Sequence, residues 1–267
     1  MKKRIVVIDS GIGGLFVLRE MDKIILGYDF VYMADNIHAP YGNKSKALLK
    51  KIGEEVVCGA IKKYSPEMIV IACNTLTVNA INFLRNKFKD VVFVGVEPAI
   101  KQAKIYGGNT IVLSTPSTQK NFKFLEKKIN KQLQKEYHEE GVKYKSEDKI
   151  FWIADALLAN KIEENFENLD VVVPYLESNL LSYKDCNIDN LVLGCTHYLA
   201  LKKQLKNLFG DVSIFDGSLA VAKRAKSLLK ANKENKKNNK QIKFICTNRD
   251  REYENKLKKY YNLIKNN

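Results

Sequence analysis

Two cysteines stand in similar sequence settings and are the first candidates for chemistry. Cys73 lies in the segment IVIACNT (69–75) and Cys195 in the segment LVLGCTH (191–197), so each follows a buried strand-like run and precedes polar residues and a helix-like run. At such a junction, backbone N–H groups and the helix dipole favour the thiolate, the form of cysteine that acts as a base or nucleophile. A buried and inert thiol is the alternative at each position. The polar neighbours, which occur twice, favour a functional role for both cysteines.

Two thiols that face each other suit a reaction that moves a proton from one face of a carbon to the other. One thiolate removes the proton while the opposite thiol returns one, and the reverse reaction exchanges the two roles. The α-hydrogen of an amino acid is very weakly acidic, so the site must also hold the α-carboxylate with N–H and hydroxyl donors while negative charge spreads into it. The two cysteine segments therefore predict racemisation of a small amino acid.

A glycine-rich segment, DSGIGG (9–14), follows the first strand-like run and opens a helix-like run. Its glycines do not have the GxGxxG spacing of a dinucleotide-binding loop. They do allow the backbone to approach a small anion closely. The sequence leaves two interpretations of Asp9 open: it assists proton transfer at Cys73, or it caps the helix.

The composition places limits on the class of protein. The 267 residues are 45% hydrophobic and 28% charged, and no apolar run approaches the roughly 20 residues that a membrane-spanning helix needs. We therefore expect a cytoplasmic protein with no membrane partner. The five cysteines show no close pairing and no zinc-ligand spacing, which indicates free thiols. Cys58, Cys186 and Cys246 lack the polar neighbours described above, so we expect them to be structural.

The net charge of +15, with 45 Lys and Arg against 30 Asp and Glu, has two interpretations. One is nucleic-acid binding, and the other is a composition rich in Lys and Asn that is spread over solvated faces. The densest basic run, 230–243, contains no aromatic side chains, so we favour the second interpretation and expect no nucleic-acid partner. A basic surface still helps to gather an anionic substrate.

Short apolar runs alternate with amphipathic runs, a pattern typical of parallel sheets flanked by helices. The sequence predicts strands at 5–8, 30–33, 68–72, 91–94, 110–113, 150–153, 191–193, 212–215 and 242–246, and helices at 15–21, 46–64, 75–88, 199–209 and 253–264.

The predicted fold class is α/β, with two similar lobes that are each a mostly parallel sheet flanked by helices. We predict the active site in the cleft between them, because open α/β sheets bind ligands at the carboxyl ends of their strands. Lobe A is predicted to comprise 1–97 plus 210–267, and lobe B 98–209.

Taken together, the motifs resemble one known family over nearly the whole chain. They are DSGIGG (9–14), PYG (40–42), ACNT (72–75), GVEP (95–98), TxxT (115–118), GCTHY (194–198) and FDGS (215–218). The sequence resembles the glutamate racemases of the aspartate/glutamate racemase superfamily.

The resemblance implies an enzyme that interconverts L- and D-glutamate without pyridoxal phosphate, flavin or metal, and whose product enters peptidoglycan. It implies that Cys73 and Cys195 are the acid/base pair, that Asp9 assists Cys73, and that His197 with a glutamate assists Cys195. The implied substrate-binding residues are Asp9, Ser10, Tyr41, Gly42, Asn74, Thr75, Thr118, Thr196 and His197. It also implies a homodimer.

Some positions depart from the family pattern. Leu199 replaces the family's proline after the second cysteine motif, and His38 is not expected before Pro40; we interpret His38 as a substitution at the pocket rim. The glutamate that assists Cys195 has two candidates. Glu177 lies in a similar local context, but Glu163 lies closer to the family's spacing from Cys195, so we favour Glu163.

Three other hypotheses remain open from the sequence. The first is a racemase of the same superfamily that acts on aspartate. The second is a cysteine hydrolase with Cys195 as nucleophile and His197 as base, which leaves the Cys73 segment unexplained. The third is the nucleic-acid-binding protein that the net charge suggests.

Overall fold

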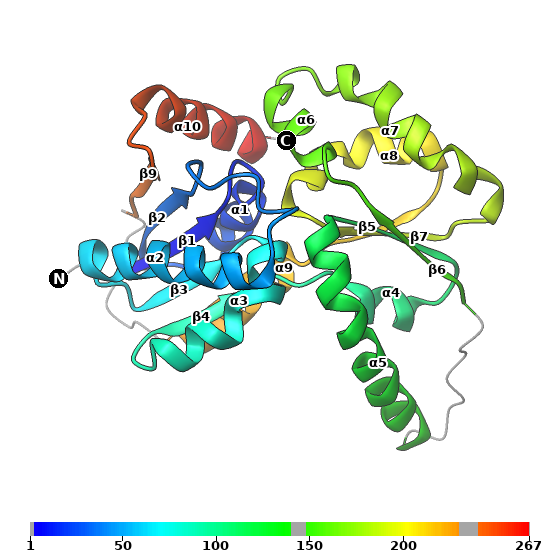
Figure 1. Cartoon of the computed structure of the whole chain (residues 1–267), viewed down its shortest axis with the longest axis horizontal. Coiled ribbons are helices and arrows are strands. Elements are labelled where there is room, and N and C mark those ends of the chain that lie inside the picture. The colour runs from blue at the N-terminus through cyan, green and yellow to red at the C-terminus, as the bar shows by residue number, and fades with distance from the viewer. Residues whose placement is uncertain (1–2, 140–147, 230–239, 267) are drawn as a thin grey trace. The chain divides into compact units, whose positions relative to one another are not determined.

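The computed structural model describes residues 3–139, 148–229 and 240–266. The chain divides into two compact units: Met1–Glu97 with Gly217–Asn267 form unit 1, and Pro98–Asp216 form unit 2. Each unit contains one parallel sheet with helices packed around it (Figure 1). Most of the basic run at 230–243 lies outside the described residues.

Unit 1 has a five-stranded sheet in the order β4-β3-β1-β2-β9. Its elements are β1 (Arg4–Asp9), α1 (Leu15–Ile24), β2 (Asp29–Ala34), α2 (Lys46–Tyr64), β3 (Met68–Ile71), α3 (Asn74–Lys87), β4 (Val92–Gly95), α9 (Ser218–Leu228), β9 (Ile242–Cys246) and α10 (Arg251–Asn266).

Both faces of this sheet are covered by helices, which explains the almost continuous apolar runs of its strands. Side chains alternate between the two faces along a strand. Val6 and Ile8 of β1 are fully buried in a cluster with residues of α2 and α3. On the other face, the ring of Tyr32 lies 6.3 Å from that of Phe244, which lies 5.4 Å from the ring of Tyr261 in α10.

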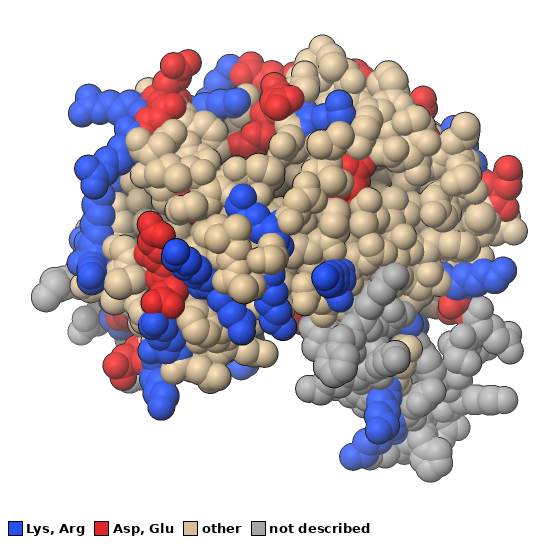
Figure 2. Space-filling model, in the orientation of Figure 1, with Lys and Arg blue, Asp and Glu red and all other residues tan. Residues whose placement is uncertain are grey.

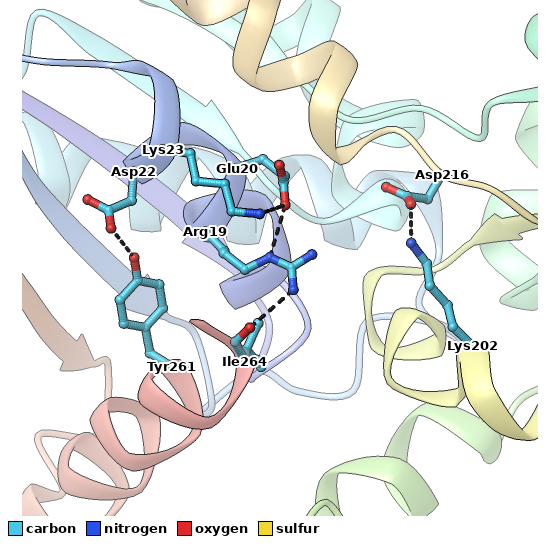
Figure 3. Close-up of polar contacts among 8 residues, drawn as sticks. All are labelled: Arg19, Glu20, Asp22, Lys23, Lys202, Asp216, Tyr261 and Ile264. Atoms are coloured by element: carbon cyan, nitrogen blue, oxygen red, sulfur yellow. Dashed lines mark hydrogen bonds and ion pairs between the residues drawn. The ribbon is translucent and has the colours of Figure 1, made fainter. Parts of the chain in front are cut away.

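A buried aspartate in α1 holds α10 in place. Tyr261 donates a hydrogen bond of 2.8 Å to Asp22 Oδ2 (Figure 3), and Lys265 Nζ and Lys240 Nζ lie 2.9 Å and 2.7 Å from the same carboxylate. Burial raises the pKa of Asp22, but its contacts with Lys240, Lys265 and Tyr261 outweigh burial and hold the pKa below its ordinary value. The last helix is therefore joined to the first by ionic contacts as well as by packing.

Unit 2 has a four-stranded sheet in the order β6-β5-β7-β8. Its elements are α4 (Ile100–Tyr106), β5 (Thr110–Ser114), α5 (Pro116–Glu139), β6 (Ile150–Ala154), α6 (Leu158–Glu164), the 3₁₀ helix η1 (Leu169–Val172), α7 (Val173–Leu180), the 3₁₀ helix η2 (Leu181–Cys186), β7 (Asn190–Gly194), the 3₁₀ helix η3 (Thr196–Leu201), α8 (Lys202–Phe209) and β8 (Ser213–Phe215). Lys202 Nζ at the start of α8 donates a 2.7 Å bond to Asp216 Oδ2, just after β8 (Figure 3).

The predicted fold class, parallel sheets flanked by helices, is confirmed. The region predicted as a helix at 199–209 begins as η3 and continues as α8, in keeping with the frequent 3₁₀ turns at the ends of α-helices. The predicted return to lobe A at residue 210 falls before β8, whereas the chain divides after it. The physical reason is that β8 pairs with β7 and so belongs to the sheet of unit 2.

Charged side chains of both signs share the visible surface. Figure 2 shows Lys and Arg interspersed with Asp and Glu. Within the described residues, no helix combines the length and hydrophobicity needed to cross a membrane.

Candidate active site

In unit 1, polar residues meet where three neighbouring parallel strands end. Asp9 is the last residue of β1 and pairs with Ala34 of β2, so Asp35 follows beside it. On the other side, Ile8 pairs with Ile71 of β3. The Asp35 N–H donates to the Asp9 carbonyl at 2.8 Å, and the Ala72 N–H donates to the Ile8 carbonyl at 2.7 Å. The ladder therefore places Cys73, which follows Ala72, at the same edge as both aspartates.

Cys73 lies at the junction of β3 and α3, as the sequence predicts. Its side chain is buried, at 6% exposure, and its carbonyl accepts the N–H of Thr77 at 2.9 Å in the first turn of the helix. Asn74 and Thr75 are also buried. Among the described residues, the Oδ1 atom of Asn74 has no hydrogen-bond partner. A buried acceptor of this kind favours a ligand with a donor group.

Asp9 is fully buried and receives a 2.6 Å hydrogen bond from the N–H of Gly14 to its Oδ2 atom. A Cβ atom at Gly14 would lie 2.7 Å from Asp9 Cβ and 3.0 Å from Ala72 Cβ. Glycine is therefore needed there for the glycine-rich turn to pack against the carboxylate. The Asp9 carboxylate thus holds the turn before α1, whose N-cap is Gly14, and this contact is compatible with a second role beside Cys73.

Tyr41 is buried at the same end of the sheet and donates a 2.5 Å hydrogen bond to Asp35 Oδ2. Burial raises the pKa of Tyr41 well above its ordinary value, and Asp35, Cys73 and Asp9 raise it further because each disfavours a second negative charge. Tyr41 therefore stays a neutral hydroxyl close to the predicted proton-transfer groups of unit 1. Its neighbour Gly42 and the loop residue Ser10 are also buried.

In unit 2, Cys195 belongs to a row of three groups. The Cys195 Sγ atom lies 3.9 Å from His197 Nδ1, and His197 Nε2 lies 2.6 Å from Glu163 Oε2. Burial alone would lower the pKa of His197, but the contacts with Cys195 and Glu163 outweigh it and hold the pKa well above its ordinary value. The protonated form of the imidazole is therefore favoured in this place between a sulfur atom and a carboxylate.

Helix α6 brings Glu163 to His197. Asp155, directly after β6, accepts the N–H groups of Leu157 and Leu158 through Oδ1, each at 2.8 Å, and so caps the start of α6. The same helix packs against η3, which carries His197. This geometry distinguishes the two candidate glutamates, because Glu177 is exposed on α7.

The remaining predicted residues of unit 2 lie at the same edge of its sheet. Ser114 at the end of β5 pairs with Gly194 at the end of β7, which places the following residues of both strands side by side. The Thr115 hydroxyl caps α5 by accepting the Thr118 N–H at 3.3 Å, and it donates to the Thr118 hydroxyl at 2.9 Å. Thr118 and Thr196 are both buried.

The structure thus groups the predicted site residues within their own units. Unit 1 holds Asp9, Ser10, Tyr41, Gly42, Cys73, Asn74 and Thr75, and unit 2 holds Thr118, Glu163, Cys195, Thr196 and His197. Sequence reasoning missed the supporting carboxylates Asp35 and Asp155. A usable signal was present, since each follows a strand and an alanine directly, as Ala34-Asp35 and Ala154-Asp155. Among the described residues, no group of three or more His, Cys, Asp or Glu side chains is placed to hold a metal ion.

Known proteins with similar sequences and structures include glutamate racemases. The sequence is 34% identical over 233 residues to glutamate racemase of Aliarcobacter butzleri (strain RM4018), which covers 83% of this chain and 82% of that protein. The fold is similar to Escherichia coli glutamate racemase in complex with L-glutamate and the activator UDP-MurNAc-ala, with a TM-score of 0.81, 26% identity and coverage of 98% of this chain and 96% of that one. It is also similar to the Francisella tularensis enzyme in complex with D-glutamate, with a TM-score of 0.72, 25% identity and coverage of 96% and 93%. No protein-family model matches the chain.

Proposed function

This chain belongs to the glutamate racemase family and is an amino-acid racemase, and from that membership we propose that it interconverts L- and D-glutamate by proton transfer between the thiols of Cys73 and Cys195. The observation that carries the proposal is the repeated placement of a buried cysteine at the junction between a parallel strand and a helix, with polar groups in the first turn of that helix.

The proposed reaction needs one base and one acid on opposite faces of the α-carbon. One thiolate takes the α-proton, the electron pair of the C–H bond passes into the α-carboxylate, and the opposite thiol gives its proton to the other face of the carbon. The thiolate and the thiol have then exchanged roles, so the site is set for the opposite enantiomer. The reaction consumes no external oxidant, reductant or water.

Each thiol has its own assisting group in this proposal. Protonated His197, held by Glu163, supplies a proton donor 3.9 Å from the Cys195 sulfur. Asp9 lies at the strand edge beside Cys73 and is the carboxylate that assists it. The two thiols are therefore assisted by different groups, an imidazolium in unit 2 and a carboxylate in unit 1.

The other predicted residues would hold the substrate. The free Oδ1 acceptor of Asn74 suits the α-ammonium group. Backbone N–H groups at the start of α3 and the hydroxyls of Thr75 and Thr196 suit the α-carboxylate, where negative charge develops during proton transfer. Ser10, Tyr41, Gly42 and Thr118 complete the proposed binding set.

The row Cys195–His197–Glu163 would by itself also suit a cysteine hydrolase. Family membership and the second cysteine segment at Cys73 favour racemisation. Following the family resemblance, we further propose that the D-glutamate produced serves peptidoglycan synthesis. A homodimer, a cytoplasmic location and independence from cofactors remain predictions.

The function is tested by incubating the protein with L-glutamate in deuterated water. We expect deuterium at the α-carbon and formation of D-glutamate, followed by NMR and chiral chromatography, without any added cofactor. L-aspartate in a parallel reaction tests the rival substrate. Faster deuteration of aspartate than of glutamate would overturn the choice of substrate, and no deuteration of either would overturn the racemase proposal.

A further inference from the structure

Asp35 is a fully buried carboxylate that joins the loop after β2 to the residue that follows β9. It follows β2, and its oxygens accept a 2.7 Å bond from the Thr247 hydroxyl and the 2.5 Å bond from Tyr41. His38 Nδ1 lies 3.0 Å and 2.9 Å from the two carboxylate oxygens. Thr247 directly follows β9, the strand beside β2 (Figure 1).

The loop that carries His38 is fixed on its outer side as well. The Ile37 N–H donates to the Thr247 hydroxyl at 3.3 Å, and the Asn248 N–H donates to Asn36 Oδ1 at 3.3 Å. His38 is partly exposed, with 28% of its side chain accessible to solvent, and Thr247 is also partly exposed, whereas Tyr41 is buried. His38 therefore closes the outer side of the carboxylate, while Tyr41 contacts it from the buried side.

Tyr41 connects this arrangement to the predicted active site. Its side chain belongs to the same buried cluster as Cys73. Asp35 accepts the Tyr41 hydrogen, so the lone pairs of the phenolic oxygen remain available as acceptors for a ligand. The direction of that oxygen depends on where the Asp35 carboxylate is held.

We propose that His38 is a positioning residue of the racemase: by binding Asp35 it fixes the Tyr41 hydroxyl beside Cys73 and thereby tunes the binding of the amino-acid substrate. This inference rests on the proposed function, in which Tyr41 contacts substrate. It replaces the interpretation of His38 as a substitution at the pocket rim. Without the His38 contact, Thr247 would hold the Asp35 carboxylate from one side only. The angle of the hydrogen bond between Asp35 and Tyr41 would then vary.

The first test compares kinetic constants in single and double variants. We expect His38→Ala to raise KM for glutamate by about three- to tenfold, the scale of one lost ordinary hydrogen bond, with kcat changed less than about twofold. His38→Asn keeps a donor near the position of Nδ1 and should restore KM to within about twofold of the wild type. In a Tyr41→Phe background, His38→Ala should raise KM no further, because the group through which it acts is gone.

A second readout does not depend on catalysis. Iodoacetamide labelling followed by peptide mass spectrometry measures the alkylation rates of Cys73 and Cys195 in the same sample. We expect His38→Ala to change the rate at Cys73 by about threefold or more, since Tyr41 packs in its cluster, and to leave Cys195 in unit 2 unchanged.

The proposal is overturned if His38→Ala leaves KM and Cys73 alkylation unchanged, if its effect on KM is the same with and without the Tyr41 hydroxyl, or if both cysteines respond alike. A different outcome is that the wild type fails to racemise glutamate while His38→Ala still changes the alkylation rate of Cys73 alone. That result would support the positioning role of His38 and overturn the proposed function.

Discussion

The Glu163 carboxylate and the His197 imidazole form a short contact, with 2.6 Å between Oε2 and Nε2. The imidazole is buried, and its other nitrogen faces the Cys195 sulfur at 3.9 Å. Because a cation in this place is stabilised on both sides, the pKa of His197 stays well above its ordinary value in spite of burial. Glu163 therefore favours the protonated form of His197, the group that we propose assists Cys195.

Replacing this glutamate should change the titration of His197. In Glu163→Gln, we expect the pKa of His197 to fall and kcat/KM to decrease by about ten- to a hundredfold, less than the loss of an acid/base group itself because the imidazole remains. NMR titration of the imidazole signals measures the pKa, since the chain has only 3 histidines and His197→Asn identifies the signal. Glu177→Gln is the matched control and should behave as the wild type.

Glu163→Gln should also change how the free energy of unfolding depends on pH. A raised pKa in the folded state adds stability that is complete below the ordinary value of 6.5 and is lost as the pH rises through the folded value. The difference in free energy of unfolding between wild type and Glu163→Gln should thus be largest in mildly acidic solution and shrink at alkaline pH. A difference that grows with pH would contradict this account.

The two cysteines should be separately essential. We expect Cys73→Ser and Cys195→Ser each to reduce kcat/KM for glutamate by about a thousandfold or more, because a serine hydroxyl is a far weaker base and acid than a thiol. Each variant should retain α-hydrogen exchange in deuterated water mainly from the one enantiomer that its remaining thiol faces. Cys58→Ser, in the half-exposed middle of α2, is the control and should keep wild-type activity. Racemisation at the wild-type rate in either active-site variant would refute the two-base proposal.

The strands and the two cysteine segments were predictable because their signals are local. A buried run such as 69–71 needs only its own side chains to indicate a strand, and β9 begins and ends where the apolar pattern predicts. The sheet to which β8 belongs and the start of η3 were less predictable, because sheet membership and 3₁₀ geometry depend on neighbours in space.

The supporting residues were not predictable for the same reason. Asp35 gains its role from Thr247, which lies 212 positions away in the chain. Glu163 and Glu177 were distinguished by spacing alone in the sequence, whereas in the structure the Asp155 cap and the packing of α6 on η3 select Glu163. Contacts between distant segments decide these roles. The local signal at Asp35 and Asp155, an aspartate directly after an alanine at a strand end, marks the two positions but does not identify their partners.

Two glycines, one in the turn before α1 and one on the exposed side of α2, give a matched test of packing at that turn. In Gly14→Ala, the new methyl group would lie 2.7 Å from Asp9 Cβ, so we expect a loss of about 1 to 3 kcal/mol in the free energy of unfolding and a reduced kcat/KM. At Gly59 in α2, no heavy atom lies within 4 Å of an added Cβ, so Gly59→Ala should stabilise the protein by about 0.5 to 1 kcal/mol. Urea unfolding measures both. Equal effects of the two substitutions would show that the turn at Gly14 is less tightly packed than described.

Because the Asp22 carboxylate anchors α10, the free energy of unfolding should depend on pH in the acidic range. Asp22→Asn removes the charge that Lys240, Lys265 and Tyr261 contact, so we expect a loss of about 1 to 3 kcal/mol in the free energy of unfolding at pH 7, as for hydrogen bonds to a charged group. The folded pKa lies below the ordinary 3.8, which means that this stability is complete above that value and disappears as the pH falls through the folded pKa. Urea unfolding of both proteins at pH 7 and at pH values below 3.8 measures the difference, which should shrink in acid.

Tyr261→Phe, which keeps the ring and both lysine contacts, is the control and should lose less stability than Asp22→Asn. If the gap between wild type and Asp22→Asn were instead constant across this range, the charge on Asp22 would not be what joins α10 to α1.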